Sequence, residues 1–261
     1  MKIGIDIMGG DFAPAKTILG AILALNELPK NISVVLFGKE KAIISELKKH
    51  KQKKDLFEII DCSDFILMGE HPTKAFREKP NSSIAKGFEY LAKGKIDGFA
   101  SAGNTGAMFV GGFYAVKTIP GILRPPLSTV IPREDGGVTI LLDVGANADC
   151  KPDVLYQFGV LGSLFSKHVC GIAQPKVSLL NLGEEKTKGN LLTQATYPLM
   201  EGNPDFNFIG NCEGRDIFNS KSDVIVCDGF TGNIVLKQAE GMYSIMKKRN
   251  LLDNYFKRLN Y

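Results

Sequence analysis

The chain has 261 residues, 44% of them hydrophobic and 23% charged, which is enough for one large globular domain or two small ones. Its formal net charge of +4 is too small to indicate a nucleic-acid-binding protein. Five cysteines without a CxxC pair favour a reducing cytosol over a disulfide framework, and we expect no signal peptide and no membrane-spanning helix.

Strand-like apolar runs alternate with helical patterns along the whole chain. The runs are continuously hydrophobic, which is typical of strands buried on both faces of a parallel sheet. We predict strands at Lys2–Asp6, Ser33–Gly38, Phe57–Cys62, Gly98–Ala102, Val138–Asp143, Lys176–Leu182, Asn207–Gly210 and Asp223–Asp228. We predict helices at Ala15–Leu28, Ser83–Ala92, Thr105–Lys117 and Pro152–Lys167.

One segment departs from this alternation. Ser128–Pro132 and Val138–Asp143 flank Arg133-Glu-Asp-Gly-Gly137, a pattern that predicts a β-hairpin and therefore a mixed, largely parallel sheet. No internal repeat, low-complexity linker or shift in composition divides the chain. We therefore expect a single α/β domain over residues 1–261.

The stretch from Gly241 to Tyr261 has apolar residues at roughly helical spacing, with lysines and arginines between them. It predicts a basic amphipathic helical segment. Such a segment packs on the domain or on a second subunit, or it lies on an anionic lipid surface.

Several common kinds of active site are absent from the sequence. There is no GxxxxGK[ST] loop, no GxGxxG after the first strand and no GxSxG elbow. His50, His71 and His168 are scattered, without partners at the spacing of metal ligands, so we expect no metal site. No cofactor is expected either.

Six polar, glycine-rich clusters follow short apolar runs. In α/β proteins such loops lie at the carboxyl ends of strands, where ligands bind, and glycine lets backbone N–H groups approach an anion. Six of them predict a shared cleft. The clusters are Asp6–Asp11, Ser101–Gly106, Asp143–Asn147, Asn181–Glu185, Gly210–Asp216 and Asp228–Asn233.

With these loops the chain closely resembles the phosphate acyltransferases of bacterial phospholipid synthesis. The matching segments span most of the chain in order. They are Ile5–Pro14, Ser101–Ala107, Leu142–Pro152, Leu180–Glu185 with Lys188–Asn190, Gly210–Phe218, Cys227–Lys237 and, more weakly, Ala75–Ser83.

The resemblance implies a three-layer α/β/α fold similar to the isocitrate and isopropylmalate dehydrogenases and to phosphotransacetylase. It implies transfer of a long-chain acyl group from acyl carrier protein to inorganic phosphate, giving acyl phosphate. It also implies a homodimer in the cytoplasm, at the inner face of the membrane, that passes product to a membrane glycerol-phosphate acyltransferase. Because the family usually continues past a position like Tyr261 with another glycine-rich strand and a helix, we expect the chain to be truncated relative to it.

The reaction requires a phosphate cradle, stabilisation of an oxyanion and room for a thiol to leave. A thiol with a pKa near 8.5 leaves with little acid assistance, and phosphate is itself the nucleophile, so neither a catalytic histidine nor a serine is needed. We expect catalysis by positioning and by preorganised N–H donors.

The candidate catalytic residues are Lys188, Lys237, Asn104, Asp228 and Asn233. The candidate substrate- and phosphate-binding residues are Gly9, Gly10, Asp11, Arg77, Ser101, Gly103, Thr105, Gly106, Asp143, Gly145, Asn147, Asn181, Gly183, Glu184, Asn190, Arg215, Gly229, Thr231 and Gly232.

Each class of candidate has a structural alternative. The carboxylates orient cations and loop amides or accept a proton from phosphate; the structural alternative is that they only cap loops. Asparagines either bind the acyl carbonyl or pantetheine amides or form turns. Lysines and arginines either bind substrate or are solvated surface charges, and Thr105 is also a candidate helix cap.

Two further features stay open. Cys150, beside a glycine-rich loop, is either a nucleophile or a small buried residue, and no histidine lies near it in the sequence to activate it. The run Lys48-Lys-His-Lys-Gln-Lys-Lys54 is interpreted as a solvated helix end, with a docking face for acidic acyl carrier protein as the alternative.

Other functions with a similar fold are a coenzyme-A-dependent phosphotransacetylase and an NAD-linked hydroxyacid dehydrogenase. The dehydrogenase would need paired metal-binding aspartates on one helix and an adenine-binding loop, and the sequence has neither. A non-catalytic acyl-carrier or lipid-binding scaffold is the alternative from another class.

Overall fold

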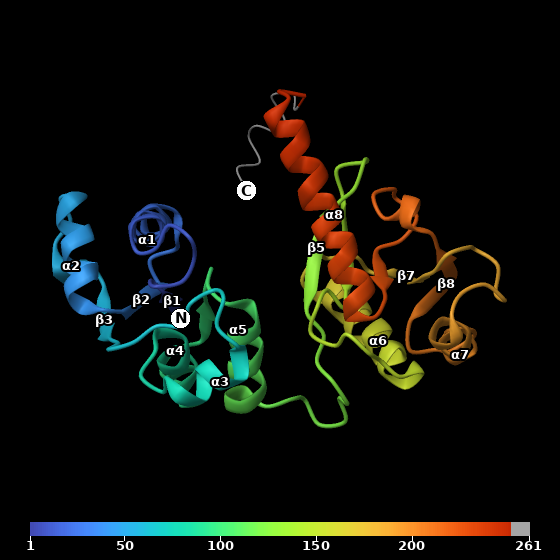
Figure 1. Cartoon of the computed structure of the whole chain (residues 1–261), viewed down its shortest axis with the longest axis horizontal. Coiled ribbons are helices and arrows are strands. Elements are labelled where there is room, and N and C mark those ends of the chain that lie inside the picture. Colours follow the sequence, from blue (N-terminus) through green and yellow to red (C-terminus); the bar gives the residue numbers. More distant parts are fainter. Residues whose placement is uncertain (252–261) are drawn as a thin grey trace. The chain divides into compact units, whose positions relative to one another are not determined.

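A computed structural model describes residues 1–251, and parallel strands dominate both units into which the chain divides, Met1–Ile119 and Pro120–Tyr261 (Figure 1). We call them the amino-terminal and the carboxy-terminal unit. Their combination in one domain stays a prediction.

The amino-terminal unit has four parallel strands in the order β3-β2-β1-β4. They are β1 (Lys2–Asp6), β2 (Ser33–Gly38), β3 (Glu58–Asp61) and β4 (Gly98–Ala100). The helical elements are α1 (Ala15–Glu27), α2 (Glu40–Lys49), η1 (Lys54–Leu56), α3 (Pro72–Glu78), α4 (Ser83–Ala92), α5 (Thr105–Gly111) and the π-helical turn η2 (Gly112–Val116).

Strand β2 shows why this unit has three layers. Val34 and Leu36 pack into a core with α1 and α2, whereas Val35 and Phe37 pack with the side that carries α4. Alternate side chains of a strand point to opposite faces, so a strand apolar at every position is buried between two helical layers.

The carboxy-terminal unit has five strands in the order β5-β6-β9-β7-β8, of which only β5 is antiparallel to its neighbour. They are β5 (Ser128–Pro132), β6 (Val138–Leu142), β7 (Lys176–Leu180), β8 (Asn207–Cys212) and β9 (Val224–Val226). The helical elements are α6 (Pro152–His168), α7 (Leu191–Met200), η3 (Gly214–Asp216) and α8 (Gly229–Lys248).

The core of this unit has two sides as well. Ile140, Leu142, Val224 and Val226 pack with α6 and α7. Leu141 and Ile225, which alternate with them, pack in a second cluster with Val235 of α8. The predicted α/β fold with a largely parallel, mixed arrangement is confirmed, with the strands divided between two sheets.

The helix predicted over Thr105–Lys117 ends its α-helical part at Gly111, and the π-helical turn η2 completes it. The helix predicted from Gly241 begins twelve residues earlier, at Gly229, and continues to Lys248. The part of the predicted tail helix beyond Leu251 lies outside the described residues. Within residues 1–251, the helices are all too short or too polar to cross a bilayer.

Candidate active site

Two of the six polar loops meet in the amino-terminal unit. Strands β1 and β4 are parallel neighbours, so the loops that follow them leave the same edge of the sheet. The Ser101 hydroxyl donates to Asp6 Oδ2 at 2.7 Å and accepts from the Gly103 N–H at 2.9 Å. Asp6, 1% exposed, also accepts from the Met8 N–H. The buried carboxylate therefore joins the two loops.

The glycines of these loops allow a close approach of two backbones. A Cβ atom on Gly9 would lie 2.5 Å from Asp6 Oδ2 and 2.7 Å from the Gly103 nitrogen. Gly10 follows with a φ of +98°, which favours glycine, and Asp11 is exposed beyond it. Gly9 and Gly103 thus bring the loops into contact.

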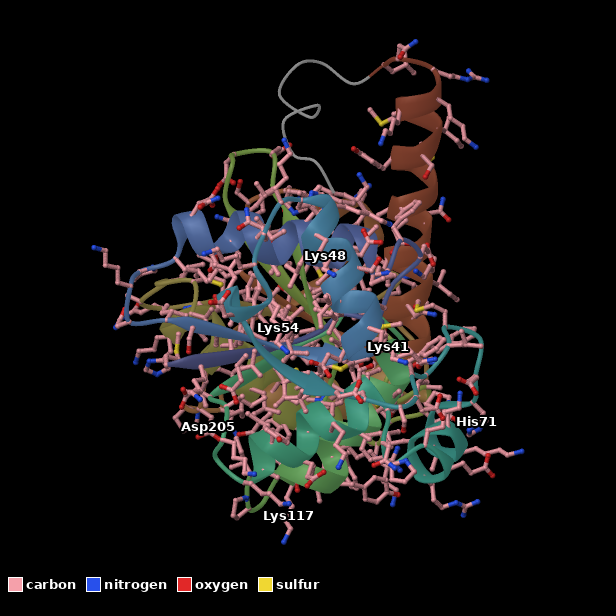
Figure 2. The ribbon with its side chains drawn as sticks, turned by 90° about the vertical axis from the view of Figure 1, so that its left-hand side faces the viewer. Lys41, Lys48, Lys54, His71, Lys117 and Asp205 are labelled. Carbon is pink, nitrogen blue, oxygen red and sulfur yellow. The ribbon has the colours of Figure 1, made fainter. Side chains whose placement is uncertain are left out.

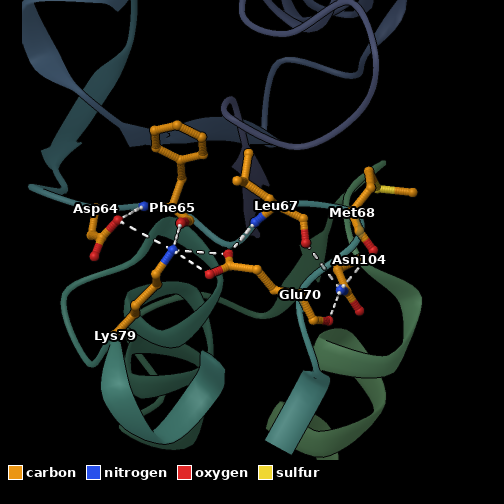
Figure 3. A network of polar contacts seen from close by, with 7 residues as sticks. All are labelled: Asp64, Phe65, Leu67, Met68, Glu70, Lys79 and Asn104. Atoms are coloured by element: carbon orange, nitrogen blue, oxygen red, sulfur yellow. Dashed lines mark hydrogen bonds and ion pairs between the residues drawn. The ribbon is translucent and has the colours of Figure 1, made fainter. Parts of the chain in front are cut away.

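Asn104 fixes a third segment to this edge (Figure 3). Its Nδ2 donates to the carbonyl oxygens of Leu67, Met68 and Glu70 at 3.0–3.1 Å, and its Oδ1 accepts from the Ala107 N–H as the N-cap of α5. Both amide atoms of Asn104 are thus engaged by the protein, and its side chain is buried at 5% exposure. Thr105 at the first helical position is exposed, and Gly106 follows it.

Lys79 holds the same segment from the other side (Figure 3). Its ammonium lies 2.8 Å from a Glu70 carboxylate oxygen, donates to the Phe65 carbonyl at 3.0 Å and lies 3.8 Å from Asp64. The hydrogen bond from Lys79 lowers the pKa of Glu70 below its usual value. Sequence reasoning did not identify Lys79 or Glu70, although Lys79 belongs to the weakly matching segment. Arg77, two residues before Lys79, is exposed.

Asp143 organises the first loop of the carboxy-terminal unit. Its fully buried carboxylate accepts five hydrogen bonds of 2.7–3.1 Å, from the backbone N–H groups of Leu127, Gly145, Ala146 and Asn147 and from Asn147 Nδ2. An aspartate that accepts this many donors holds a loop in one conformation. These contacts fit both the orientation of loop amides and simple capping of the loop, and a role of Asp143 toward phosphate stays a prediction.

The amino terminus of α8 packs tightly against this loop. Asp228 caps the helix by accepting from the N–H of Thr231 at 2.8 Å and from its hydroxyl at 2.8 Å. The Gly229 N–H donates to the Asn147 carbonyl at 2.8 Å. A Cβ on Gly232 would lie 1.9 Å from the Asp143 carbonyl oxygen. The loops after β6 and β9 are therefore one assembly, and Asn233 lies exposed beside Gly145.

The loops after β7 and β8 form a second assembly in this unit. Asn181 Nδ2 donates to the Lys188 carbonyl at 3.1 Å, and Asn211 Nδ2 donates to the Glu185 carbonyl at 3.0 Å. Asn190 caps α7 through the Thr193 N–H. Gly183 is buried where the loop turns back toward Lys188. Because β6, β9, β7 and β8 are parallel, all four loops of the unit lie at one edge of its sheet.

The candidate charged residues differ in their surroundings. Lys237 lies 2.8 Å from Glu240 on the exposed face of α8, Arg215 lies 3.0 Å from Glu213, and Glu184 pairs with Lys221. Lys188 is exposed and forms no ion pair with any residue in the range 1–251. Lys188 and the exposed Arg77 are thus candidate cations without an acidic partner among the described residues.

Cys150 is disfavoured as a nucleophile. Burial, followed by the nearby charges of Asp143 and Asp228, raises the pKa of its thiol to about 11. The thiol therefore stays protonated at neutral pH, whereas the thiolate is the reactive form. Of the two interpretations of Cys150, the structure favours the unreactive residue, with the thiol partly buried.

The fold is shared with known acyl-transfer enzymes. A phosphotransacetylase from Streptococcus pyogenes superposes with a TM-score of 0.68 at 18% identity, over 97% of this chain and 83% of that one. A branched-chain phosphotransacylase from Enterococcus faecalis V583 superposes with a TM-score of 0.62 at 13% identity, over 93% of this chain and 84% of that one. At these identities the likeness concerns the fold.

Curated relatives are similar in sequence over nearly the whole chain. The phosphate acyltransferase of Dictyoglomus thermophilum is 49% identical over 242 residues, which cover 93% of this chain and 71% of that protein. The phosphate acyltransferase of Syntrophomonas wolfei is 41% identical over 266 residues, which cover 100% of this chain and 83% of that protein. A family model described as "Fatty acid synthesis protein" matches residues 1–258. The chain belongs to this fatty acid synthesis protein family.

Proposed function

We propose that the protein is a phosphate acyltransferase that converts a long-chain acyl thioester of acyl carrier protein and inorganic phosphate to acyl phosphate and free carrier protein. The observation that carries this proposal is the identity of up to 49% to curated phosphate acyltransferases along 93% of the chain. Loops rich in glycine and asparagine at the carboxyl edges of both sheets suit an enzyme that binds an anion through N–H donors.

The reaction needs few groups from the protein. A phosphate oxygen attacks the thioester carbonyl carbon, a tetrahedral oxyanion forms, and the carbon–sulfur bond then breaks to release the carrier's thiolate. Because a thiol with a pKa near 8.5 is a good leaving group, no general acid is required at the sulfur. Acceleration then depends on positioning and on donors to the oxyanion.

Two groups of residues perform these tasks in our proposal. Lys188 and Asn233, which are exposed at the edge of the carboxy-terminal sheet, contact substrate. Asn104, Asp143 and Asp228 hold the loops, since their side chains are already engaged by backbone donors or acceptors. The roles of Lys237, Arg77, Arg215 and the loop glycines in binding phosphate stay predictions.

Hydroxylamine trapping of acyl phosphate tests this function. Palmitoyl carrier protein and phosphate should give palmitoyl hydroxamate, with no product when phosphate is omitted. Lys188→Ala should lower kcat/KM about 100-fold, as expected for loss of a group that stabilises the transition state. Lys186→Ala is the matched control: Lys186 lies in the same loop as Lys188 but is paired with Glu201 at the end of α7, so this variant should retain activity.

Other outcomes point to other functions. Turnover of acetyl-coenzyme A at a higher rate than palmitoyl carrier protein would indicate a phosphotransacetylase. Binding of the carrier without phosphate-dependent turnover would indicate a scaffold. Unchanged activity of Lys188→Ala would remove that lysine from the site.

We also propose that the protein is cytoplasmic, that it contacts the inner membrane surface peripherally as a homodimer, and that it passes acyl phosphate to a membrane glycerol-phosphate acyltransferase for phosphatidic acid synthesis. In support, Ile234, Met242 and Ile245 are more than half exposed along α8, and Lys247, Lys248 and Arg249 follow them. Cosedimentation with anionic vesicles should be lost in Met242→Glu/Ile245→Glu.

A further inference from the structure

The positive charge of the chain is concentrated in one short segment of the amino-terminal unit. Residues 39–54 contain seven lysines and two glutamates, a formal charge of +5, whereas the whole chain carries +4. The remainder of the protein therefore has a formal charge of −1. Residues 39–54 are therefore strongly basic in a protein that is not basic as a whole.

Helix α2 and the turn after it present these lysines to solvent. Ile43 and Leu47 of α2 are buried in the core, so the opposite face of the helix is turned toward solvent. Lys41 and Lys48 are seven residues apart, so they lie on the same face, and both are exposed. Lys51 and Lys53 are also exposed, and Figure 2 shows Lys41, Lys48 and Lys54 along α2 and the turn.

Acidic neighbours neutralise only part of this surface. Lys49 lies 2.6 Å from Glu46 and Lys54 lies 3.7 Å from Glu40, yet the side chains of these lysines remain 64% and 69% exposed. Within residues 1–251, Lys41, Lys48, Lys51 and Lys53 form no ion pair. Four cations therefore face solvent without a counter-charge from the described protein. We call them the α2 lysines.

The α2 lysines lie at a defined position relative to the loops of the same unit. Strand β2 is the parallel neighbour of β1, so α2 starts at the sheet edge that carries the Asp6–Asp11 loop. The ten residues of α2 extend about 15 Å away from that edge. A macromolecule bound along α2 thus lies one helix length from the loops, a separation that suits a substrate carried on a flexible arm.

We propose that the α2 lysines form the docking surface for the acidic carrier protein that delivers the acyl thioester; this inference rests on the proposed function and deepens it. Complementary charge steers a partner toward its site and fixes its orientation. A membrane is the less suitable occupant, because a membrane-binding amphipathic helix needs a free apolar face and Ile43 and Leu47 are used in the core. Lys51 has a φ of +56°, so the test leaves it unchanged.

The test compares two triple variants with the same change in charge. Lys41→Glu/Lys48→Glu/Lys53→Glu reverses the α2 lysines, and Lys30→Glu/Lys167→Glu/Lys176→Glu is the control at exposed lysines elsewhere. We expect the first variant to raise KM for palmitoyl carrier protein at least tenfold, with KM for palmitoyl-N-acetylcysteamine unchanged. The control should change neither KM by more than twofold.

Salt and direct binding supply independent readouts. The wild-type KM for the carrier should rise between 50 and 300 mM NaCl, and that of the α2 variant should not, because salt screens exposed charges. Fluorescence anisotropy with labelled holo-carrier measures docking without turnover, so it decides the inference even if no acyl phosphate is formed. If thermal unfolding shows that the triple glutamate variant is misfolded, a triple variant with Lys→Gln at the same three positions is used in its place.

Three results would overturn the proposal. The first is carrier affinity equal in the α2 variant and the control. The second is an equal rise in KM for the carrier and for the small thioester, which would indicate general disruption of the site. The third is loss of anionic-vesicle binding with carrier binding intact, which would assign the surface to lipid.

Discussion

Asn147 donates twice to the same oxygen of Asp143: its backbone N–H lies 2.7 Å from Oδ2 and its Nδ2 lies 2.8 Å from Oδ2. The same Nδ2 also donates to the Pro125 carbonyl at 2.9 Å. The loop after β6 is therefore closed by a side chain from each of its ends.

Asp143→Asn should destabilise the carboxy-terminal unit by at least about 3 kcal/mol, because an amide N–H₂ would face backbone donors in a buried site. Urea unfolding followed by circular dichroism measures the change. Asp149→Asn, an exposed position in the same loop, should stay within about 0.5 kcal/mol of the wild type. Equal stability of the two variants would contradict the role assigned to Asp143.

Gly232→Ala should lower the free energy of unfolding by about 1–3 kcal/mol, since the new methyl group would overlap the Asp143 carbonyl and displace the start of α8. Gly241→Ala in the same helix meets no atom within 4 Å and should stabilise the protein by about 0.5–1 kcal/mol. Thermal unfolding of the two variants provides the comparison. A loss at Gly241 as large as at Gly232 would argue against close packing as the cause.

Asn104→Ala should release the segment 64–70. It removes the N-cap of α5, which costs about 1 kcal/mol, and leaves three backbone carbonyls without their common donor. Hydrogen exchange of the amides of residues 64–70 should accelerate at least tenfold. Asn104→Asp retains an oxygen for the cap but not the donor, so it should accelerate exchange in this segment while α5 stays protected. Asn31→Ala, on the surface of the same unit, should change neither the exchange of residues 64–70 nor the protection of α5.

The thiol of Cys150 gives a prediction on pH. Its pKa is raised to about 11 by burial, so alkylation by iodoacetamide should be slow at pH 7.5 and increase as the pH approaches 11. Because the folded state keeps the proton to a higher pH than the unfolded state, this group contributes stability below about pH 9 that is lost as the pH rises to about 11. Cys150→Ala should keep acyl phosphate formation and reduce the loss of stability over that interval. Abolished turnover would instead support an acyl-cysteine intermediate.

Several elements are predictable from local sequence. Strands β1 and β2 and helix α4 have the predicted bounds, since continuous apolar runs end at polar residues and Ser82 caps α4 through the Ala85 N–H. The hairpin of β5 and β6 is also confirmed, because Arg133–Gly137 is a clear turn.

Other elements depend on packing. Helix α2 has Ile43 and Leu47 at helical spacing but is only ten residues long and rich in charges, and it was missed. Pro198 lies inside α7 and interrupts its helical pattern. Tertiary contacts decide such segments.

The candidate site divides in the same way. The loops of the site are recognisable in the sequence from their glycines and asparagines. Which loops lie together depends on the order of the strands: β6 and β9 are neighbours, so the loop that starts at Asp143 contacts the loop that starts at Asp228. Local sequence cannot separate a substrate ligand such as we propose for Lys188 from a positioning residue such as Asn104. Lys79 and Glu70 were missed for that reason too, because Lys79 contacts Glu70 and the Phe65 carbonyl, which lie nine and 14 residues away in the sequence.

Because each unit of the protein has its own buried cysteines, thiol labelling can follow the unfolding of each unit separately. Cys62 is the single cysteine of the amino-terminal unit, while Cys212 and Cys227 are buried in the other. Burial is the largest cause that raises the pKa of Cys62 and of Cys212 to about 12, which suppresses labelling in the native state. Peptide mass spectrometry after maleimide pulses would therefore time the opening of the two halves separately, in one unmodified sample.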